Sequence, residues 1–369
     1  MSNRSTLSSS LPVVIAVDPH KASWTAAAVD ASLRTLATIR VPVSRTGYRD
    51  LRRFARRWPQ AGWGIEGAAG LGAPLAARLR EDDVVAVDVP AKLAARVRML
   101  STGHARKSDE ADAVSVGIAA LNAGGLHRVE VDEAISALRA VVEHRDDLVK
   151  HRTQTVNRLH VLLVRLIPAG APTNLSADVA AGLLRRVRPR NPIQATLRAL
   201  AVELVAEIRH LDRRISTAGE QITTAVAATG STLTGLYGIG PLLAGKILAR
   251  VGAVTRFRSP AAFASYNGTA PIEVSSGDVV RHRLSRAGDR QLNHAMHIMA
   301  ITQLAGDTTG RAYYQRKRAD GKSHKEALRC LKRRLSDVVY RQLVLDATAV
   351  MAASLGGQQG AALESSAAG

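Results

Sequence analysis

Cysteine, aromatic residues and long apolar runs are scarce in this 369-residue sequence, and each scarcity excludes a class of protein. The single cysteine, Cys330, rules out an internal disulfide framework and favours a reducing compartment, so a cytoplasmic protein is expected. No stretch approaches the roughly 20 apolar residues of a membrane-spanning helix, and residues 1–10 lack the apolar core of a secretory signal. Aromatic residues make up only 3% of the chain, which argues against a surface that binds single strands mainly by base stacking.

Two common functional motifs are also missing. The eleven histidines and the single cysteine show no zinc-ligand spacing, so a structural zinc site is not expected. No Gly-rich loop ends in Gly-Lys-Ser or Gly-Lys-Thr, so the sequence does not indicate an ATP-driven step.

Positive charge is what the sequence has in excess. Its 51 Lys and Arg residues outnumber 31 Asp and Glu residues, which gives a formal net charge of +20. Because neutralisation of phosphates supplies most non-specific affinity for nucleic acid, this excess predicts a nucleic-acid partner. An anionic membrane would also attract such a chain, and a general bias toward Ala, Arg, Val and Gly would raise the charge without any partner.

The hydrophobic pattern divides the chain into three folded regions between two short ends. Residues 12–125 alternate strands with helices and predict a mixed sheet with flanking helices. Residues 126–229 show no strand pattern and predict a helical arm for oligomerisation, built on two long helices at 132–166 and 193–228. Residues 230–350 predict a mainly helical C-terminal domain, and residues 1–11 and 351–369 are expected to be disordered. The elements expected in the first region are strands at 13–18, 25–29, 37–43, 63–66 and 84–89, and helices at 47–58, 73–80, 90–100 and 110–121.

Four acidic residues in the first region stand where a metal site would need them. Asp18 ends the apolar run 13–17, Glu66 ends the next short apolar run, and Asp109 and Asp112 share one face of a helix. Carboxylates gathered at one point repel each other, and Mg²⁺, which takes oxygen ligands alongside phosphates, resolves that repulsion. Each acid taken singly also has an ordinary explanation, as a turn residue, a partner of an arginine or a charge in the first turn of a helix.

The C-terminal region carries its own candidate residues. Gly238 and Gly240 form a tight Gly-x-Gly turn before a helix, which resembles a helix-hairpin-helix element that grips a phosphate, although a helical hairpin with a glycine cap explains it too. Further along, the doublet Ser275-Ser276 precedes a glycine. Residues 311–341 contain 11 Lys and Arg residues against 3 acids, which indicates either a solvated helix face or a phosphate-contacting one. The candidate nucleic-acid contacts are Gly238, Gly240, Lys246, Arg281, Arg283, Arg286, Arg316, Lys317, Arg318, Lys332 and Arg333.

Three segments of the first region, Ala16-Val17-Asp18-Pro19-His20-Lys21, Gly64-Ile65-Glu66-Gly67 and Lys107-Ser108-Asp109-Glu110-Ala111-Asp112, carry a family resemblance. They resemble the RuvC-like, ribonuclease-H-fold domain of DEDD-type insertion-sequence transposases, a group that includes the Piv-type DNA invertases and the bridge-RNA-guided recombinases. Residues 230–350 resemble the C-terminal domain of the same transposases. Glu110 is a rival ligand that would point off the shared helical face, and the roles of His20 and Lys21 are open.

The resemblance implies a DNA recombinase with a composite site. Asp18, Glu66, Asp109 and Asp112 would bind Mg²⁺ or Mn²⁺, and Ser276, with Ser275 as the alternative, would attack the scissile phosphate and hold the DNA covalently. The partners implied are donor and target DNA, a noncoding bridge RNA and further copies of the chain in a dimer or tetramer. Two other functions stay open: a RuvC-like metal-dependent endonuclease that uses water, and a non-catalytic nucleic-acid-binding protein whose acids pair with arginines.

Overall fold

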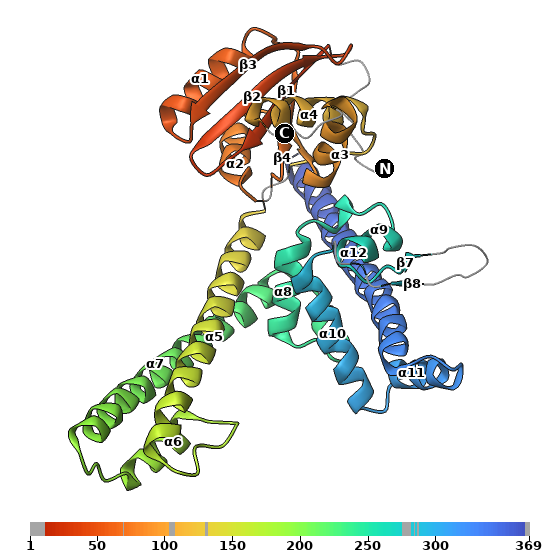
Figure 1. Ribbon diagram of the computed structural model, residues 1–369. Helices are drawn as coiled ribbons and strands as arrows, with labels where there is room; N and C mark the ends of the chain where they lie inside the picture. Colours follow the sequence, from red (N-terminus) through yellow and green to blue (C-terminus); the bar gives the residue numbers. More distant parts are fainter. Residues whose placement is uncertain are drawn as a thin grey trace. The chain divides into compact units, whose positions relative to one another are not determined.

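The chain folds into two compact units, Met1–Val131 and Asp132–Gly369, which are described separately below (Figure 1). The computed structural model describes residues 12–68, 70–102, 108–129, 132–274, 282–283, 285 and 288–365. Among the helices that it describes, none combines the length and the apolarity that crossing a bilayer requires.

The first unit is built on a six-stranded sheet with the order β3-β2-β1-β4-β5-β6. Strands β1, β2 and β3 form an antiparallel meander, β4 and β5 run parallel to β1, and β6 returns antiparallel at the far edge. The central position of β1 explains its continuous apolar run, because both faces of this strand are covered. The strands are β1 Val13–Pro19, β2 Ser23–Asp30, β3 Thr35–Pro42, β4 Gly62–Glu66, β5 Ala86–Val89 and β6 His127–Arg128.

Helices cover both faces of this sheet, and alternate residues of β1 face different helices. The odd-numbered apolar residues of β1 pack in a core with α1 (Arg45–Ala55) and α2 (Ala73–Glu81). Val14 and Ala16 pack in a second core with α3 (Ala91–Thr102) and α4 (Asp109–Asn122). This layered mixed α/β unit confirms the predicted ribonuclease-H-like fold, and it adds the short edge strand β6, which the sequence pattern did not predict.

The second unit begins with two long helices, α5 (Glu133–Leu166) and α7 (Pro192–Ala228), which pack along each other. Leu159 and Leu163 of α5 meet Ala201, Val205 and Ile208 of α7 in a buried cluster. Helix α6 (Ala177–Arg186) joins the same cluster through Ala180 and Leu184. The hydrophobic pattern did not predict α6, although Ser176 caps it by accepting a hydrogen bond from the Val179 amide.

The remaining helices pack into one core together with the near ends of α5 and α7. Leu138 of α5 and Ile222 of α7 belong to the same apolar cluster as Phe263, Met296 and Leu335, so the expected arm and C-terminal domain share a core within one unit. Helix α12 runs on to Ser365, through the segment expected to be disordered, because alanine is the strongest helix former and is frequent there. The elements are η1 Leu233–Gly235, α8 Pro241–Val251, η2 Val254–Arg256, α9 Pro260–Tyr266, β7 Ile272–Glu273, β8 His282–Arg283, α10 Arg290–Ala305, α11 Thr309–Ala319 and α12 His324–Ser365.

Candidate active site

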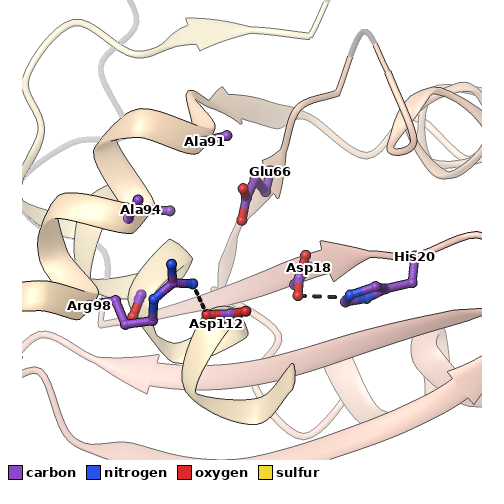
Figure 2. Close-up of a pocket in the computed structure, with 9 residues that line it drawn as sticks. Asp18, His20, Glu66, Ala91, Ala94, Arg98 and Asp112 are labelled. Carbon is purple, nitrogen blue, oxygen red and sulfur yellow. Dashed lines mark hydrogen bonds and ion pairs between the residues drawn. The ribbon is translucent and has the colours of Figure 1, made fainter. Parts of the chain in front are cut away.

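Three carboxylates from three separate elements of the first unit line one cavity of about 310 Å³ (Figure 2). Asp18 lies near the end of β1, Glu66 ends β4, and Asp112 lies in the first turn of α4. Strands β1 and β4 are parallel, and Val17 lies beside Ile65, so the residues that follow them reach the same edge of the sheet. Three of the four acids that the sequence assigns to a metal site therefore line one cavity, and their role as metal ligands stays a prediction.

The start of α4 is fixed so that Asp112 faces this cavity. Ser108 caps the helix by accepting a hydrogen bond from the Ala111 amide at 3.2 Å. Two turns further on, Gly117 lies so close to β2 that an added Cβ would stand 2.6 Å from a methyl carbon of Val29. This close approach of helix and sheet presses the first turn of α4, with Asp112, against the strand ends.

The cavity concentrates negative charge. Asp18 and Asp112 are buried, with 8% and 6% of their surfaces exposed. Burial and the nearby carboxylates of Asp18 and Asp112 raise the pKa of Glu66 to about 7, against the opposing pull of Arg98 and His20. The pKa of Glu66 is raised first by burial and second by its two acidic neighbours, so the ionised form of this carboxyl group is disfavoured in the absence of a cation.

Two nitrogen-bearing side chains, Arg98 and His20, enter the same cavity. Arg98 of α3 forms a hydrogen-bonded ion pair with Asp112. His20 lies between two acids, with Nδ1 3.6 Å from Oδ2 of Asp18 and Nε2 3.8 Å from Oδ1 of Asp109. His20 Nδ1 is buried and has no hydrogen-bond partner among the described residues.

Asp109, the fourth predicted acid, does not line the cavity. Its carboxylate forms an ion pair with Arg40 of β3 at 3.1 Å and reaches the other acids only through His20. Glu110, the rival ligand, lines a different hollow beside Thr35 and Thr38, as its position off the shared face predicts.

The donor set of this cavity fits a divalent metal that prefers oxygen. Asp18, Glu66 and Asp112 offer only carboxylate oxygens, which suits Mg²⁺ or Mn²⁺. Within the described ranges, no group of three His, Cys, Asp or Glu side chains is drawn together closely enough to hold a metal as it stands. Asp112 is instead engaged by Arg98, so binding a metal at this carboxylate requires a change of partner.

Sequence reasoning missed Arg98 and Arg40, both of which contact the predicted acids. A signal for Arg98 is present in its spacing, because it follows Ala91 by seven residues and Ala94 by four, so all three share one face of α3. No local pattern marks Arg40, because its pairing with Asp109 is made across distant elements.

The predicted serine lies in a segment whose two ends are fixed in the second unit, although Ser275, Ser276, Arg281 and Arg286 lie outside the described residues. Gly268 and Gly288 pass so close that a Cβ on Gly288 would stand 2.3 Å from the Gly268 nitrogen. Between these ends, β7 and β8 pair antiparallel. The segment therefore leaves and re-enters the unit at one point.

A buried polar network holds this point in place. Asn267 is fully buried, donates to Ser336 Oγ at 2.8 Å and accepts from the Thr269 amide and hydroxyl. Asn293 of α10 donates to the Asn267 carbonyl and accepts from Lys332 Nζ at 2.6 Å. Helices α10 and α12 are thus tied to the start of the segment.

Two predicted phosphate contacts prove to be engaged inside the second unit. Lys332 is only 8% exposed, and burial lowers its pKa, so it lies away from the surface in this structure, and its contact with nucleic acid stays a prediction. The neighbouring Lys246 pairs with Asp146 at 2.8 Å and is largely covered. The spacing of apolar residues could not show that these two lysines are covered. A lysine counts as polar in such a pattern, although its aliphatic part can pack in a core.

The other predicted contacts lie nearer the surface. Gly240 caps α8, and a Cβ added to it would meet no atom within 4 Å. Gly238 has a φ of +91°, and a Cβ added to it would stand 3.2 Å from the Met299 carbonyl oxygen. Arg316 and Arg318 are exposed on α11, Lys317 pairs with Asp320, Arg333 pairs with Asp337, and Arg283 is exposed on β8.

Comparison with known proteins agrees with this architecture. Residues 15–168 match the model of the DEDD transposases of IS110 type, described as a transposase, and residues 230–315 match the model described as the transposase IS116/IS110/IS902 family. A 43.6 kDa protein of the insertion element IS110 from Streptomyces coelicolor is 29% identical over 67% of this chain and 73% of its own length. A 44.8 kDa protein of IS116 from Streptomyces clavuligerus is 26% identical over 89% of this chain and 94% of its own.

Another relative and one solved structure complete the comparison. The putative transposase of the IS117 mini-circle from Streptomyces coelicolor is 27% identical over 87% of this chain and 91% of its own length. Thermus thermophilus RuvC, solved with a Holliday junction substrate, aligns with a TM-score of 0.26 and 16% identity over 32% of this chain and 99% of RuvC. The family matches at both ends of the chain and the relatives that span most of it agree: this protein belongs to the IS116/IS110/IS902 family of insertion-element transposases.

Proposed function

We propose that this transposase cuts and rejoins DNA at a divalent-cation site formed by Asp18, Glu66 and Asp112, with Ser276 as the nucleophile. The observation that carries the proposal is the convergence of these three carboxylates on one cavity, where two of them are buried and the third has its pKa raised to about 7. Such an accumulation of negative charge is costly to a fold and suits a cation-dependent site.

The residues of the cavity have distinct parts in this proposal. A bound Mg²⁺ would polarise the scissile phosphate and stabilise the leaving oxygen. Asp18 and Asp112 hold their oxygens in fixed positions, because one lies on a central strand and the other on a capped first turn. Asp109 acts from beside the cavity and orients His20, which in turn lies against Asp18.

Ser276 supplies the covalent step. Its hydroxyl loses a proton to solvent, its Oγ bonds to phosphorus, and the bond from phosphorus to one sugar oxygen breaks, so that oxygen leaves and takes up a proton. Rejoining reverses this exchange with a different DNA end. One phosphoester replaces another in each step, so the cycle needs no nucleotide hydrolysis, in keeping with the absence of a Gly-Lys-Ser/Thr loop.

Further partners belong to the same proposal. The formal charge of +20 and the exposed cations of α11 support DNA as the substrate. A noncoding bridge RNA would choose donor and target, and the paired helices α5 and α7 would join copies of the chain.

Trapping the covalent intermediate tests this function. The protein is incubated with Mg²⁺, any RNA that copurifies and DNA that spans an end of the element, and then denatured and digested. Mass spectrometry is expected to find a nucleotide on Ser276, and Ser276→Ala should remove the adduct while Ser275→Ala retains it. If Ser276→Ala still cuts the DNA, water is the nucleophile. If the wild-type protein cuts nothing and Asp18→Asn leaves DNA binding unchanged, the acids are structural.

A further inference from the structure

Arg98 is the single arginine among the described residues that line the acidic cavity. Its guanidinium points across the cavity at Asp112, as Figure 2 shows. Its side chain is 29% exposed, whereas that of Asp112 is 8% exposed, so the pair lies at the boundary between the cavity and solvent.

The face of α3 that carries Arg98 is otherwise made of alanines. Ala91, Ala94 and Ala95 line the cavity on the turns before Arg98, and Ala91 and Ala94 lie on the side of the cavity facing Glu66 (Figure 2). Because methyl groups fill little space, this wall leaves the cavity open, at about 310 Å³, to a group larger than a metal ion. Arg98 is the one long, cationic side chain among the described cavity-lining residues of α3, and it can reach into the space that the alanines leave open.

The guanidinium and a divalent cation compete for the same carboxylate. Asp112 has one carboxyl group, and Arg98 already donates to its Oδ1. A metal at either oxygen of this carboxylate would bring two positive charges close to the guanidinium on Oδ1, and like charges repel strongly in a partly buried site. Metal binding therefore displaces Arg98 from Asp112.

We propose that Arg98 binds the substrate phosphate in this cavity and is held on Asp112 until a divalent cation takes that carboxylate. This inference rests on the proposed function, because it needs a cation site at Asp112 and a phosphodiester as substrate. The planar guanidinium presents several donors in a fork that matches two phosphate oxygens, so the freed side chain has a partner of suitable geometry within the same cavity. Without the cation, the same contact with Asp112 keeps the arginine from the substrate.

The first test measures the affinity for Mn²⁺ by electron paramagnetic resonance. We expect Arg98→Gln to bind Mn²⁺ about tenfold more tightly than the wild type, since the cation no longer displaces a charge-assisted hydrogen bond. The measurement is made near pH 8.5, at which Glu66 is ionised. Arg96→Gln removes the same charge from the exposed side of α3 and should leave the affinity unchanged.

The second test measures binding of a short duplex that spans the junction between the element and its flanking DNA. With Ca²⁺ present, Arg98→Gln should bind the duplex about tenfold more weakly than the wild type, whereas in EDTA the two should bind alike. Arg98→Lys keeps the charge without the fork and should fall between them in Ca²⁺.

The results of these two tests distinguish a failure of the role of Arg98 from a failure of the proposed function. Equal or weaker Mn²⁺ binding by Arg98→Gln overturns the displacement, and equal duplex affinity in Ca²⁺ overturns the phosphate contact. Both results leave the metal site intact as long as the wild type binds Mn²⁺ and Asp18→Asn does not. If the wild type binds no Mn²⁺ at all, the proposed function fails, and the inference fails with it.

Discussion

The raised pKa of Glu66 predicts that metal binding at the proposed site depends on pH. A metal ligand must be ionised, so protons compete with the cation for this carboxyl group. With a pKa of about 7, the ionised fraction of Glu66 rises from about one tenth at pH 6 to about nine tenths at pH 8. The apparent affinity for Mn²⁺ or Mg²⁺ should therefore increase about tenfold between these pH values, whereas a carboxyl group with its ordinary pKa of 4.5 would produce no change there.

Titration of Mn²⁺ followed by electron paramagnetic resonance at several pH values measures this dependence. Glu66→Gln should bind Mn²⁺ more weakly and lose the rise, because the amide does not titrate. In metal-free protein the stability of the fold depends on pH with the opposite sign. Because the folded pKa of Glu66 exceeds its unfolded value, the contribution of Glu66 to stability is greatest below about pH 4.5. It is lost as the pH rises through about 7. An affinity that stays constant from pH 6 to pH 8 in the wild type would contradict a titrating Glu66 ligand.

Three predictions concern the second unit and are read from thermal unfolding. Gly288→Ala places a Cβ 2.3 Å from the Gly268 nitrogen, so it should lower the melting temperature by the equivalent of about 3 kcal/mol or prevent folding of this unit. Asn267→Ala leaves the buried Ser336 hydroxyl without its donor and should cost about 2 kcal/mol, whereas Ser336→Ala, which leaves the Asn267 amide unpaired, should cost about as much. Lys332→Met relieves a buried charge with a side chain of similar length but leaves Asn293 Oδ1 without its donor, so the melting temperature should fall by the equivalent of at most about 2 kcal/mol; a larger loss would show that the charge itself is required.

The sequence predicted the parts of this fold that depend on local pattern. The apolar run before Asp18 identified β1 correctly, and helical spacing placed Asp112 on the inner face of α4. The same spacing placed Asp109 beside it, but this residue lies at the first position of the helix, where Arg40 draws it away from the cavity. A partner supplied by a distant strand leaves no trace in the local pattern.

Other differences have similar physical causes. Lys332 reads as a surface cation because neighbouring basic residues surround it in the sequence, yet α12 turns it toward Asn293 in the interior. The two-residue strands β7 and β8 are too short for a pattern of alternating residues to appear. The ion pair between Arg98 and Asp112 joins two helices, and which of their faces meet depends on how both pack against the sheet.

The close crossing of Gly268 and Gly288 has a consequence for how this chain can change. Residues added between Gly268 and Gly288 should disturb the packing of the rest of the unit little. The contacts that hold the two ends of the segment together are made by residues outside it. Each doubling of such a segment adds only about 0.6 kcal/mol of closure entropy. We therefore expect residues inserted between the two glycines to be tolerated, with α10 and α12 held in place by Asn267, Asn293 and Ser336.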